Sequence, residues 1–227
     1  MKFVVTAGPT REHLDPVRFL SNPSTGKMGF AVARAAAMRG HEVALVAGPV
    51  SLKTPKGVRR IDVTSAREML AAVEEEMSKA KSGKPTVFVA TAAVADWRPA
   101  KCAARKLKKG QMSGILKLVR NPDILKTVAR RTKTTHSPTH PLTHSPTYLV
   151  GFAAETNDVI AEARRKCREK NLDMIVANDV TEKGSGFGVD TNRVTFVRKD
   201  GSVDRLPLMT KLAVARRIVR ECEDLCP

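Results

Sequence analysis

The sequence predicts an α/β fold: one doubly wound, mostly parallel sheet with helices on both faces and a C-terminal antiparallel hairpin. Three observations predict it. Short β-branched runs alternate with helical patterns along most of the 227 residues. The run at 87–90 is apolar throughout, as in a strand covered on both faces. Two strand-like runs, at 193–198 and 203–206, flank Asp200 and Gly201, which are typical turn residues of a hairpin.

The elements follow in β-α-β order. Gly40 ends the first helical pattern as a C′ glycine, and Ser65 with Glu68 predicts a capping box at the start of the second. This alternation makes the expected sheet Rossmann-like, with the hairpin at its edge. We expect strands at 3–6, 42–46, 58–63, 87–90, 148–153 and 174–177, and helices at 26–39, from 65 onward, at 157–170 and at 209–222.

One segment interrupts the pattern. Residues 132–147 are rich in His, Pro, Thr and Ser, and THSPT occurs there twice. Such a composition cannot bury enough surface to offset the entropy of ordering, so we expect a mobile surface insert. His136, His140 and His144 recur every four residues, but the intervening prolines exclude the helix that would align them on a metal. We expect a single domain over 1–227.

Composition limits the kinds of partner and site that this protein can have. Lys and Arg number 40 against 23 Asp and Glu, a net charge of +17, which attracts a nucleotide as well as a nucleic acid. Aromatic residues are only 4%, fewer than interleaved base stacking favours. No apolar run reaches the roughly 18 residues of a membrane span, and we expect a cytoplasmic protein without a membrane partner. Four cysteines form no CxxC pair, so no zinc site is expected.

Ligands of open α/β sheets bind beyond the carboxyl ends of the strands. The first strand leads into a small-residue loop with Gly8, and then into SNPSTGKMG at 21–29, just before a helix. This segment fails the Walker A pattern at both ends. Ser24, Thr25 and Gly26 remain at a helix N-terminus, where an anion site and simple capping of the helix by Ser24 or Thr25 are both open.

Later strands are followed by similar loops. Ala92 and Asp96 follow the strand at 87–90, and Asp96 suits a ribose hydroxyl or a metal. A basic stretch at 101–109 is either a phosphate-clamping flap or a solvated loop. Asp123 is either a ligand or a helix cap, and Phe152 is either a core residue or a base-stacking one.

The candidate residues are backbone amides, Asn, Asp and Lys, without a Ser/His/Asp or Cys/His constellation. That set suits phosphoryl or nucleotidyl transfer, in which positioning and charge stabilisation carry the catalysis. A Rossmann-type oxidoreductase would show GxGxxG, which is missing. A non-enzymatic nucleic-acid-binding module remains an alternative because of the charge.

These segments, in this order, resemble phosphopantothenoylcysteine synthetase, the ligase half of the bacterial bifunctional coenzyme A biosynthesis flavoprotein. The resemblance spans nearly the whole chain except the insert. No segment of this sequence resembles the flavin-bearing decarboxylase half, so we expect ligase activity only, whether the chain stands alone or is part of a longer one. It is carried by TAGPTRE at 6–12, DPVRFLSNPSTGKMGFAVARAAAMRG at 15–40, VAGPVSL at 46–52, SAREM at 65–69, ATAAVADWRP at 90–99, KLKK at 106–109, NPDIL at 121–125, VGFAAET at 150–156, KNLDMIVANDV at 170–180 and FG-D-N-VT at 187–195.

The resemblance implies a ligase that activates the carboxylate of 4′-phosphopantothenate with CTP, giving an acyl-cytidylate, and then forms an amide with cysteine. It implies Mg²⁺ on the triphosphate, without confident protein side-chain ligands, and a homodimer that completes the site across its interface. It leaves ATP open as the nucleotide, since a related branch uses it. Nucleic acid is not an expected partner.

The resemblance also implies a role for individual residues of the site. Asn22 is expected to hold the acyl carbonyl and Lys106 to neutralise charge at the α-phosphate, with Ser24, Thr25 and Gly26 on the acid substrate. The nucleotide is expected to contact Gly8, Ala92, Asp96, Lys106, Asn121, Pro122, Asp123, Ile124, Phe152, Lys166 and Lys170. Lys166 and Lys170 stand four apart on one predicted helix, so they project from one face.

Overall fold

A computed structural model describes residues 1–80, 83–108, 110, 114–135 and 146–226. Its central sheet has eight strands in the order β13-β12-β10-β9-β6-β1-β4-β5. The strands from β10 to β5 are parallel, whereas β12 and β13 run antiparallel at one edge, which confirms the predicted hairpin. The strands are β1 (Lys2–Ala7), β4 (Glu42–Ala47), β5 (Arg59–Asp62), β6 (Thr86–Ala90), β9 (Thr147–Glu155), β10 (Met174–Asp179), β12 (Thr195–Arg198) and β13 (Val203–Arg205).

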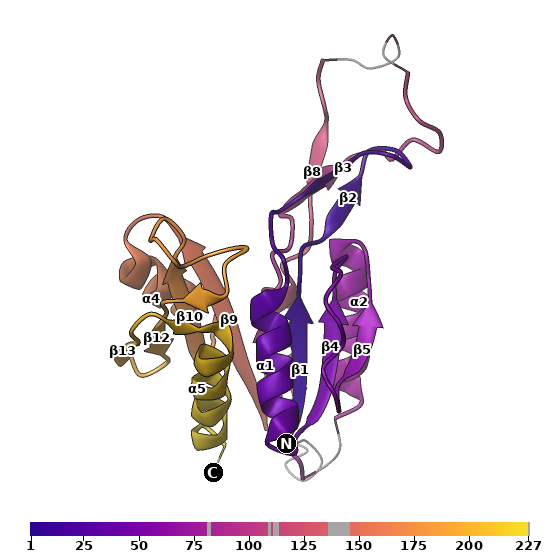
Figure 1. Cartoon of the computed structure of the whole chain (residues 1–227). Helices are drawn as coiled ribbons and strands as arrows, with labels where there is room; N and C mark the ends of the chain where they lie inside the picture. The colour runs from indigo at the N-terminus through magenta and orange to yellow at the C-terminus, as the bar shows by residue number, and fades with distance from the viewer. Residues whose placement is uncertain (81–82, 109, 111–113, 136–145, 227) are drawn as a thin grey trace.

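Helices cover both faces of this sheet, which confirms the doubly wound class (Figure 1). Side chains of α1 and α5 pack on one face, around Phe3 and Phe196, and those of α2, α3 and α4 pack on the other, around Phe88. No helix in the described ranges is long and apolar enough to cross a bilayer. The helices are α1 (Lys27–Met38), α2 (Ala66–Ser78), α3 (Ile124–Thr135), α4 (Val159–Lys170) and α5 (Lys211–Asp224).

Local signals account for these boundaries. Ser65 Oγ accepts the Glu68 N–H at 3.3 Å, and Glu68 Oε2 accepts the Thr64 N–H at 2.9 Å, which confirms the capping box of α2. The expected insert at 132–147 is shorter than predicted at its ends, because α3 continues to Thr135 and β9 begins at Thr147. Residues 136–145, with the three histidines of the possible metal ladder, lie outside the described residues.

An arm extends beyond the carboxyl ends of the strands (Figure 1). It includes the basic stretch considered above as a flap, but its small sheets were not predicted. We use "the arm" for residues 11–21 and 97–120. It holds two small antiparallel sheets, formed by β2 (Arg11–His13) with β3 (Phe19–Ser21) and by β7 (Trp97–Pro99) with β8 (Leu118–Arg120). Arg11 lies 4.5 Å from the centre of the Phe19 ring and Arg120 lies 5.2 Å from that of Trp97, so each sheet has a cation–π contact.

Candidate active site

The chain reverses its direction across the sheet between β1 and β6. From β1 it proceeds outward to β4 and β5, and then returns to the other side of β1 through β6, β9 and β10. Such a switch point leaves a crevice at the carboxyl ends of the two central strands, because the crossovers on either side leave in opposite directions. The loops after Ala7 and after Ala90 meet there, with the Ala93 N–H donating to Gly8 O at 2.9 Å.

A cavity of about 120 Å³ lies at this switch point. Six separate parts of the chain line it: the start of α1, the loop after β6, the end of β9, the end of β10, the segment 186–192 and the first residue of α5. Of the predicted site residues, the cavity is lined by Ser24, Thr25, Gly26, Ala92 and Phe152. Its other lining residues are Lys27, Met28, Gly29, Thr91, Ala93, Ala154, Asn178, Gly186, Phe187, Asn192 and Lys211.

Two glycines shape the α1 side of the cavity. Gly26 is the N-cap residue at φ +77°, in the left-handed region that glycine adopts without a Cβ penalty. A Cβ on Gly29 would lie 2.3 Å from Thr91 Oγ1 and 2.5 Å from Ala7 Cβ, so only glycine lets α1 approach β1 this closely. No side chain caps α1, hence the capping role considered for Ser24 or Thr25 is not found. The first amides of α1 face a cavity that suits an anion.

Asn22 is bound to the loop that follows β6. Its Nδ2 donates to Ala93 O at 3.0 Å, while Ser21 Oγ donates to Thr10 O at 2.8 Å. Thr10 Oγ1 in turn accepts the Ala95 N–H at 3.0 Å. Asn22 is therefore adjacent to the cavity residues Ala92 and Ala93 without itself lining the cavity.

A second group of predicted residues gathers farther along the same loop. The Asn121 N–H donates to Asp96 O at 2.8 Å, and Asn121 Nδ2 donates to Ala95 O at 2.8 Å. The Asp96 carboxyl is left exposed, and Pro122 follows Asn121 directly. The structure thus brings Asp96, Asn121 and Pro122 together, next to the cavity loop but outside the cavity lining.

Asp123 and the two α4 lysines are held by ion pairs. Asp123 Oδ1 accepts the Lys126 N–H at 3.0 Å, as a helix cap does, and Oδ2 lies 2.8 Å from Lys170 Nζ. Burial alone would raise the pKa of Asp123, but the Lys170 ammonium and the Lys126 amide together hold it below its usual value. Lys166 pairs with Glu155, and Ile124 is buried in the core. The charges of Lys166 and Lys170 are therefore each neutralised by a carboxylate.

Lys106 lies on the arm and is exposed. Its segment is tied to the turn between β2 and β3, because Arg18 Nη2 donates to Leu107 O at 2.8 Å and the Leu107 N–H donates to Asp15 Oδ2 at 3.2 Å. The Arg18 guanidinium, assisted by backbone amides, holds the pKa of the buried Asp15 well below its usual range. Lys106 does not line the cavity of its own chain, and Lys109 lies outside the described residues.

Several cavity residues were not predicted from the sequence. Asn178 is buried at the end of β10, where the rule about carboxyl ends of strands, applied to MIVAND at 174–179, would have found it. Phe187 and Lys211 carry no comparable signal, because their places at the cavity depend on the tertiary fold of the segment 184–192, which buries Lys211 but leaves Phe187 partly exposed. The same segment also holds Lys27, whose Nζ lies 2.7 Å from Asp190 Oδ1.

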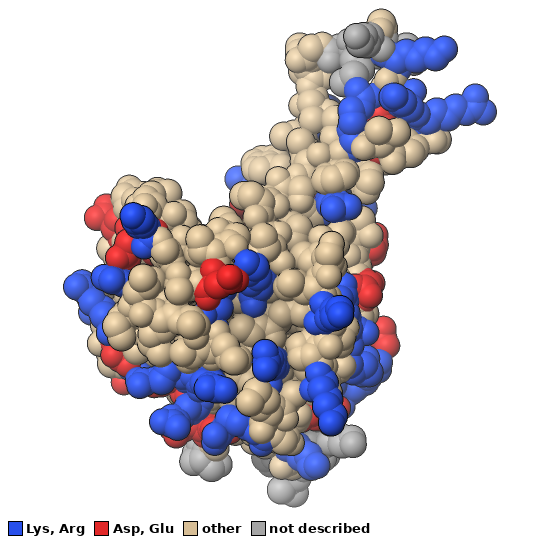
Figure 2. Space-filling view, in the orientation of Figure 1, with Lys and Arg blue, Asp and Glu red and all other residues tan. Residues whose placement is uncertain are grey.

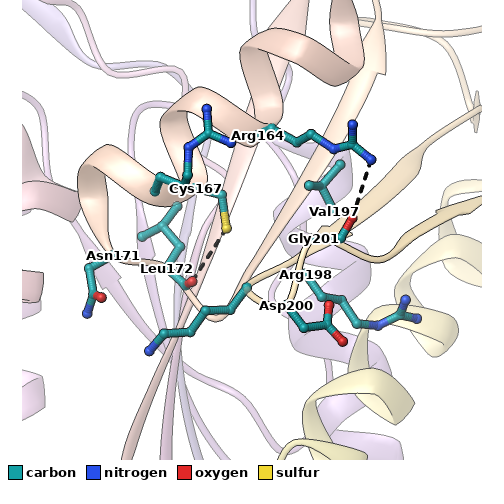
Figure 3. A pocket seen from close by; sticks show the side chains of 10 residues that line it. Arg164, Cys167, Asn171, Leu172, Val197, Arg198, Asp200 and Gly201 are labelled. Atoms are coloured by element: carbon teal, nitrogen blue, oxygen red, sulfur yellow. Dashed lines mark hydrogen bonds between the residues drawn. The ribbon is translucent and has the colours of Figure 1, made fainter.

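A larger hollow of about 620 Å³ lies away from the switch point, between the end of α4 and the β12–β13 turn (Figure 3). Arg164 donates to Gly201 O at 3.4 Å there, and Cys167 Sγ donates to Leu172 O at 3.4 Å. Burial raises the pKa of the Cys167 thiol, which keeps it protonated and unreactive. The C-terminal end of α4 carries partial negative charge. Four cations, those of Arg164, Arg168, Arg198 and Lys199, line the hollow beside Asp200, so charge does not exclude a phosphate there. Its place separates it from the switch-point cavity, because it does not lie at the carboxyl ends of the parallel strands.

Basic side chains gather on parts of the surface, whereas potential metal ligands form no cluster in the described part of the chain. Lys and Arg side chains lie over the body, interspersed with acidic ones, and gather again at the far end of the arm (Figure 2). In the part of the chain that the structure describes, no group of three or more His, Cys, Asp or Glu side chains is placed to hold a metal ion. All four cysteines are free thiols.

Fold and cavity together define a doubly wound α/β protein with a cavity at its switch point, where proteins of this class bind their ligands. The chain belongs to the family of the DNA/pantothenate metabolism flavoprotein C-terminal domain, whose model matches residues 1–225. This confirms the resemblance drawn from the sequence motifs.

Relatives and solved structures agree with this family. The "Coenzyme A biosynthesis bifunctional protein CoaBC" of Vibrio cholerae is 47% identical over 220 residues, which are 96% of this chain and 51% of the relative. That of Escherichia coli K12 is 46% identical, over 97% of this chain and 51% of the relative. The chain thus spans about half the length of these relatives. A crystal structure of a CoaBC C-terminal domain superimposes with a TM-score of 0.78 at 41% identity, covering 99% of this chain and 94% of that one.

A more distant structure has the same fold. The "DNA/Pantothenate Metabolism Flavoprotein from Streptococcus pneumoniae" gives a TM-score of 0.76 at 22% identity, covering 99% of both chains.

Proposed function

We propose that this chain is a phosphopantothenate–cysteine ligase of coenzyme A biosynthesis that uses CTP. The observation that carries the proposal is the switch-point cavity, in which the amides of α1 lie beside the loop held by Asn22. An activated acid needs both features: a site for phosphate groups and a polar side chain next to the reacting carbonyl. The membership of the family and the relatives named for coenzyme A biosynthesis support the pathway.

The proposed reaction has two steps. A carboxylate oxygen of 4′-phosphopantothenate attacks the α-phosphorus of CTP, the bond to the β-phosphate oxygen breaks, and pyrophosphate leaves. The amine of cysteine then attacks the acyl carbon of the acyl-cytidylate, loses a proton, and expels CMP as the amide forms. The enzyme supplies position and charge stabilisation rather than a covalent nucleophile.

Each residue role follows from its place. Asn22 lies next to the cavity, on the segment before α1, and is bonded to the loop after β6 that presents Ala92, so we assign it to the acyl carbonyl. Phe152 lines the cavity and offers a ring face to the nucleoside. Gly8, Ser24, Thr25 and Gly26 present backbone amides and hydroxyls, and the group around Asp96 and Asn121 extends the site toward the ribose.

Mg²⁺ is part of the proposal. The donors at the cavity, such as the Asn178 amide and the Thr91 hydroxyl, are oxygen ligands of the kind this ion accepts while it keeps phosphate and water ligands. Bound there, the ion would neutralise triphosphate charge.

We also propose a homodimer, in which the arm of one protomer reaches the cavity of its partner. Large apolar side chains of the arm are exposed, as is common at a protein interface, and the basic segment with Lys106 lies on the same arm. Lys106 would then neutralise charge at the α-phosphate of the partner's site. The exposed apolar residues of the arm are Val17, Phe19, Trp97, Ile115, Leu116 and Leu118.

Pyrophosphate release tests the function. We expect release with 4′-phosphopantothenate and CTP, less with ATP, and amide product only when cysteine is added. Faster release with ATP would reassign the nucleotide and keep the ligase. No release with either nucleotide would remove the ligase proposal, and titration with duplex and single-stranded DNA at moderate salt would then test the nucleic-acid alternative.

A further inference from the structure

Lys211 is a buried cation without a carboxylate partner. It is the first residue of α5, and its exposed fraction is only 7%. Its Nζ donates to two carbonyl oxygens, those of Gly186 at 3.0 Å and Val189 at 2.6 Å. No salt bridge to Lys211 occurs within the described ranges. Burying an ammonium group without a counter-charge is costly, so its position requires a compensating partner.

The groups around Lys211 increase the free-energy cost of burying its ammonium group. Burial lowers the pKa of Lys211, the nearby Lys27 ammonium lowers it further, and Asp190 opposes both. Asp190 is already paired with Lys27, which also donates to Gly188 O at 2.8 Å. Two ammonium groups therefore hold the same loop, 184–190, and share one carboxylate. The net charge here is positive.

This charge lies at the switch-point cavity. Lys211 and Lys27 both line it, together with Gly26 and Gly29 at the uncapped start of α1. An ammonium group has three N–H donors, and the loop carbonyls accept two of them from Lys211. One donor remains for a ligand in the cavity, which the first residues of α1, with their unpaired backbone amides, also line.

We propose that Lys211 binds a phosphate group in this cavity while it holds loop 184–190 as one wall of the site. The ligand supplies the missing counter-charge. The inference deepens the proposed function, since both the nucleotide and 4′-phosphopantothenate carry phosphate. Loop 184–190 places Phe187 against the same cavity, so loss of Lys211 would affect both the charge and the shape of the site.

Three substitutions separate these two effects. Lys211→Met removes charge and hydrogen bonds, Lys211→Gln keeps a donor for the loop without charge, and Lys211→Arg keeps the charge. Lys183→Met is the matched control, because Lys183 is exposed on the neighbouring segment, does not line the cavity and loses the same charge. The measurements are calorimetric titrations with inorganic tripolyphosphate, CTP, cytidine, 4′-phosphopantothenate and pantothenate.

We expect Lys211→Met and Lys211→Gln to weaken tripolyphosphate and CTP about tenfold, as loss of one charge-assisted hydrogen bond does, while cytidine binds as to wild type. Lys211→Arg should retain most of the affinity, and Lys183→Met all of it. A loss confined to 4′-phosphopantothenate relative to pantothenate would also support the proposal and identify that phosphate as the ligand.

Two results would overturn the proposal. Equal losses for cytidine and CTP in Lys211→Gln would leave Lys211 a purely structural role, and unchanged affinity for every phosphate compound would remove it from the site. Should Lys211→Met fail to fold, Lys211→Gln and Lys211→Arg carry the comparison. Tripolyphosphate binding does not depend on ligation, so failure of the ligase proposal appears separately, as absent pyrophosphate release by wild type.

Discussion

Asn22 donates a hydrogen bond of 3.0 Å from Nδ2 to the carbonyl oxygen of Ala93, which joins the segment before α1 to the loop after β6. The two residues lie 71 positions apart in the sequence. The bond fixes one side of the switch-point cavity and holds the Asn22 amide next to it. The first prediction tests this bond.

Asn22→Asp should lower the rate of pyrophosphate release by on the order of a hundredfold. The new carboxylate loses the donor to Ala93 and repels both that carbonyl oxygen and the acid substrate. Asn22→Ala, which removes the bond without adding charge, should lose less. Ser21→Ala serves as the neighbouring control, since the Ser21 hydroxyl donates to the backbone oxygens of Thr10 and Asn22. Equal rates for wild type and Asn22→Asp would exclude Asn22 from the site.

Lys106→Ala should reduce pyrophosphate release by on the order of a hundredfold, because one charge-stabilising donor is lost. If Lys106 acts in the partner's site, mixing Lys106→Ala with Asn22→Asp should restore about a quarter of wild-type activity, since mixed dimers then contain one intact site. Activity is measured after subunit exchange. No recovery on mixing, with exchange confirmed by mass, would place Lys106 in the site of its own chain.

Glu76 should contribute strongly to stability at neutral pH. It is 1% exposed and pairs with Lys2 at 3.5 Å, with Lys79 at 2.9 Å and with Arg59. Glu76→Gln leaves the buried Lys2 without a counter-charge, so the free energy of unfolding should fall by about 3 kcal/mol at pH 7. Urea denaturation measures it. Glu75→Gln is the control, because its exposed pair with Lys79 should contribute less than about 1 kcal/mol.

The Glu76 contribution should also depend on pH. Burial alone would raise the pKa of this carboxyl, but Lys79, Arg59 and Lys2 hold it below its usual value. A depressed pKa stabilises the folded state above the unfolded pKa of about 4.3, and this stabilisation is lost as the pH falls through the folded pKa. The difference between wild type and Glu76→Gln should therefore shrink below about pH 4. A constant difference down to pH 3 would contradict the assignment.

Gly29→Ala should destabilise the fold although alanine favours helices. Helix propensity favours alanine by about 1 kcal/mol, whereas the new Cβ would overlap Thr91 and Ala7, and overpacking costs about 1–3 kcal/mol. We expect a lower urea midpoint together with weaker nucleotide binding, as α1 moves away from β1. Gly114→Ala, where a Cβ meets nothing within 4 Å, should leave both unchanged. A raised midpoint in Gly29→Ala would mean that α1 is not held this closely.

The sheet could be predicted from the sequence because its strands are apolar on both faces. Runs such as 3–6 and 87–90 carry that signal locally, as do the capping pair Ser65 and Glu68 and the turn at Asp200. The arm could not be predicted in the same way. Its strands have only three residues each, too few for a periodicity of two to appear.

Part of the cavity lining could also be predicted from local sequence. Loops after strands mark the cavity edge, so Ser24, Thr25, Gly26, Ala92 and Phe152 lie where their positions indicate. Lys211 could not be identified, because a lysine at the start of a helix is usually solvated and only the fold-back of 184–190 buries it.

The end of α3 and the start of β9 lie at the edge of the sheet away from the cavity. The residue before β9 is fixed there, where the Thr86 N–H donates to Pro146 O at 3.0 Å at the very start of β6. Residues added between α3 and β9 would therefore leave the cavity at the opposite edge of the sheet unchanged. A fluorophore or an affinity tag placed between Thr135 and Pro146 would report on the protein without obstructing its substrates.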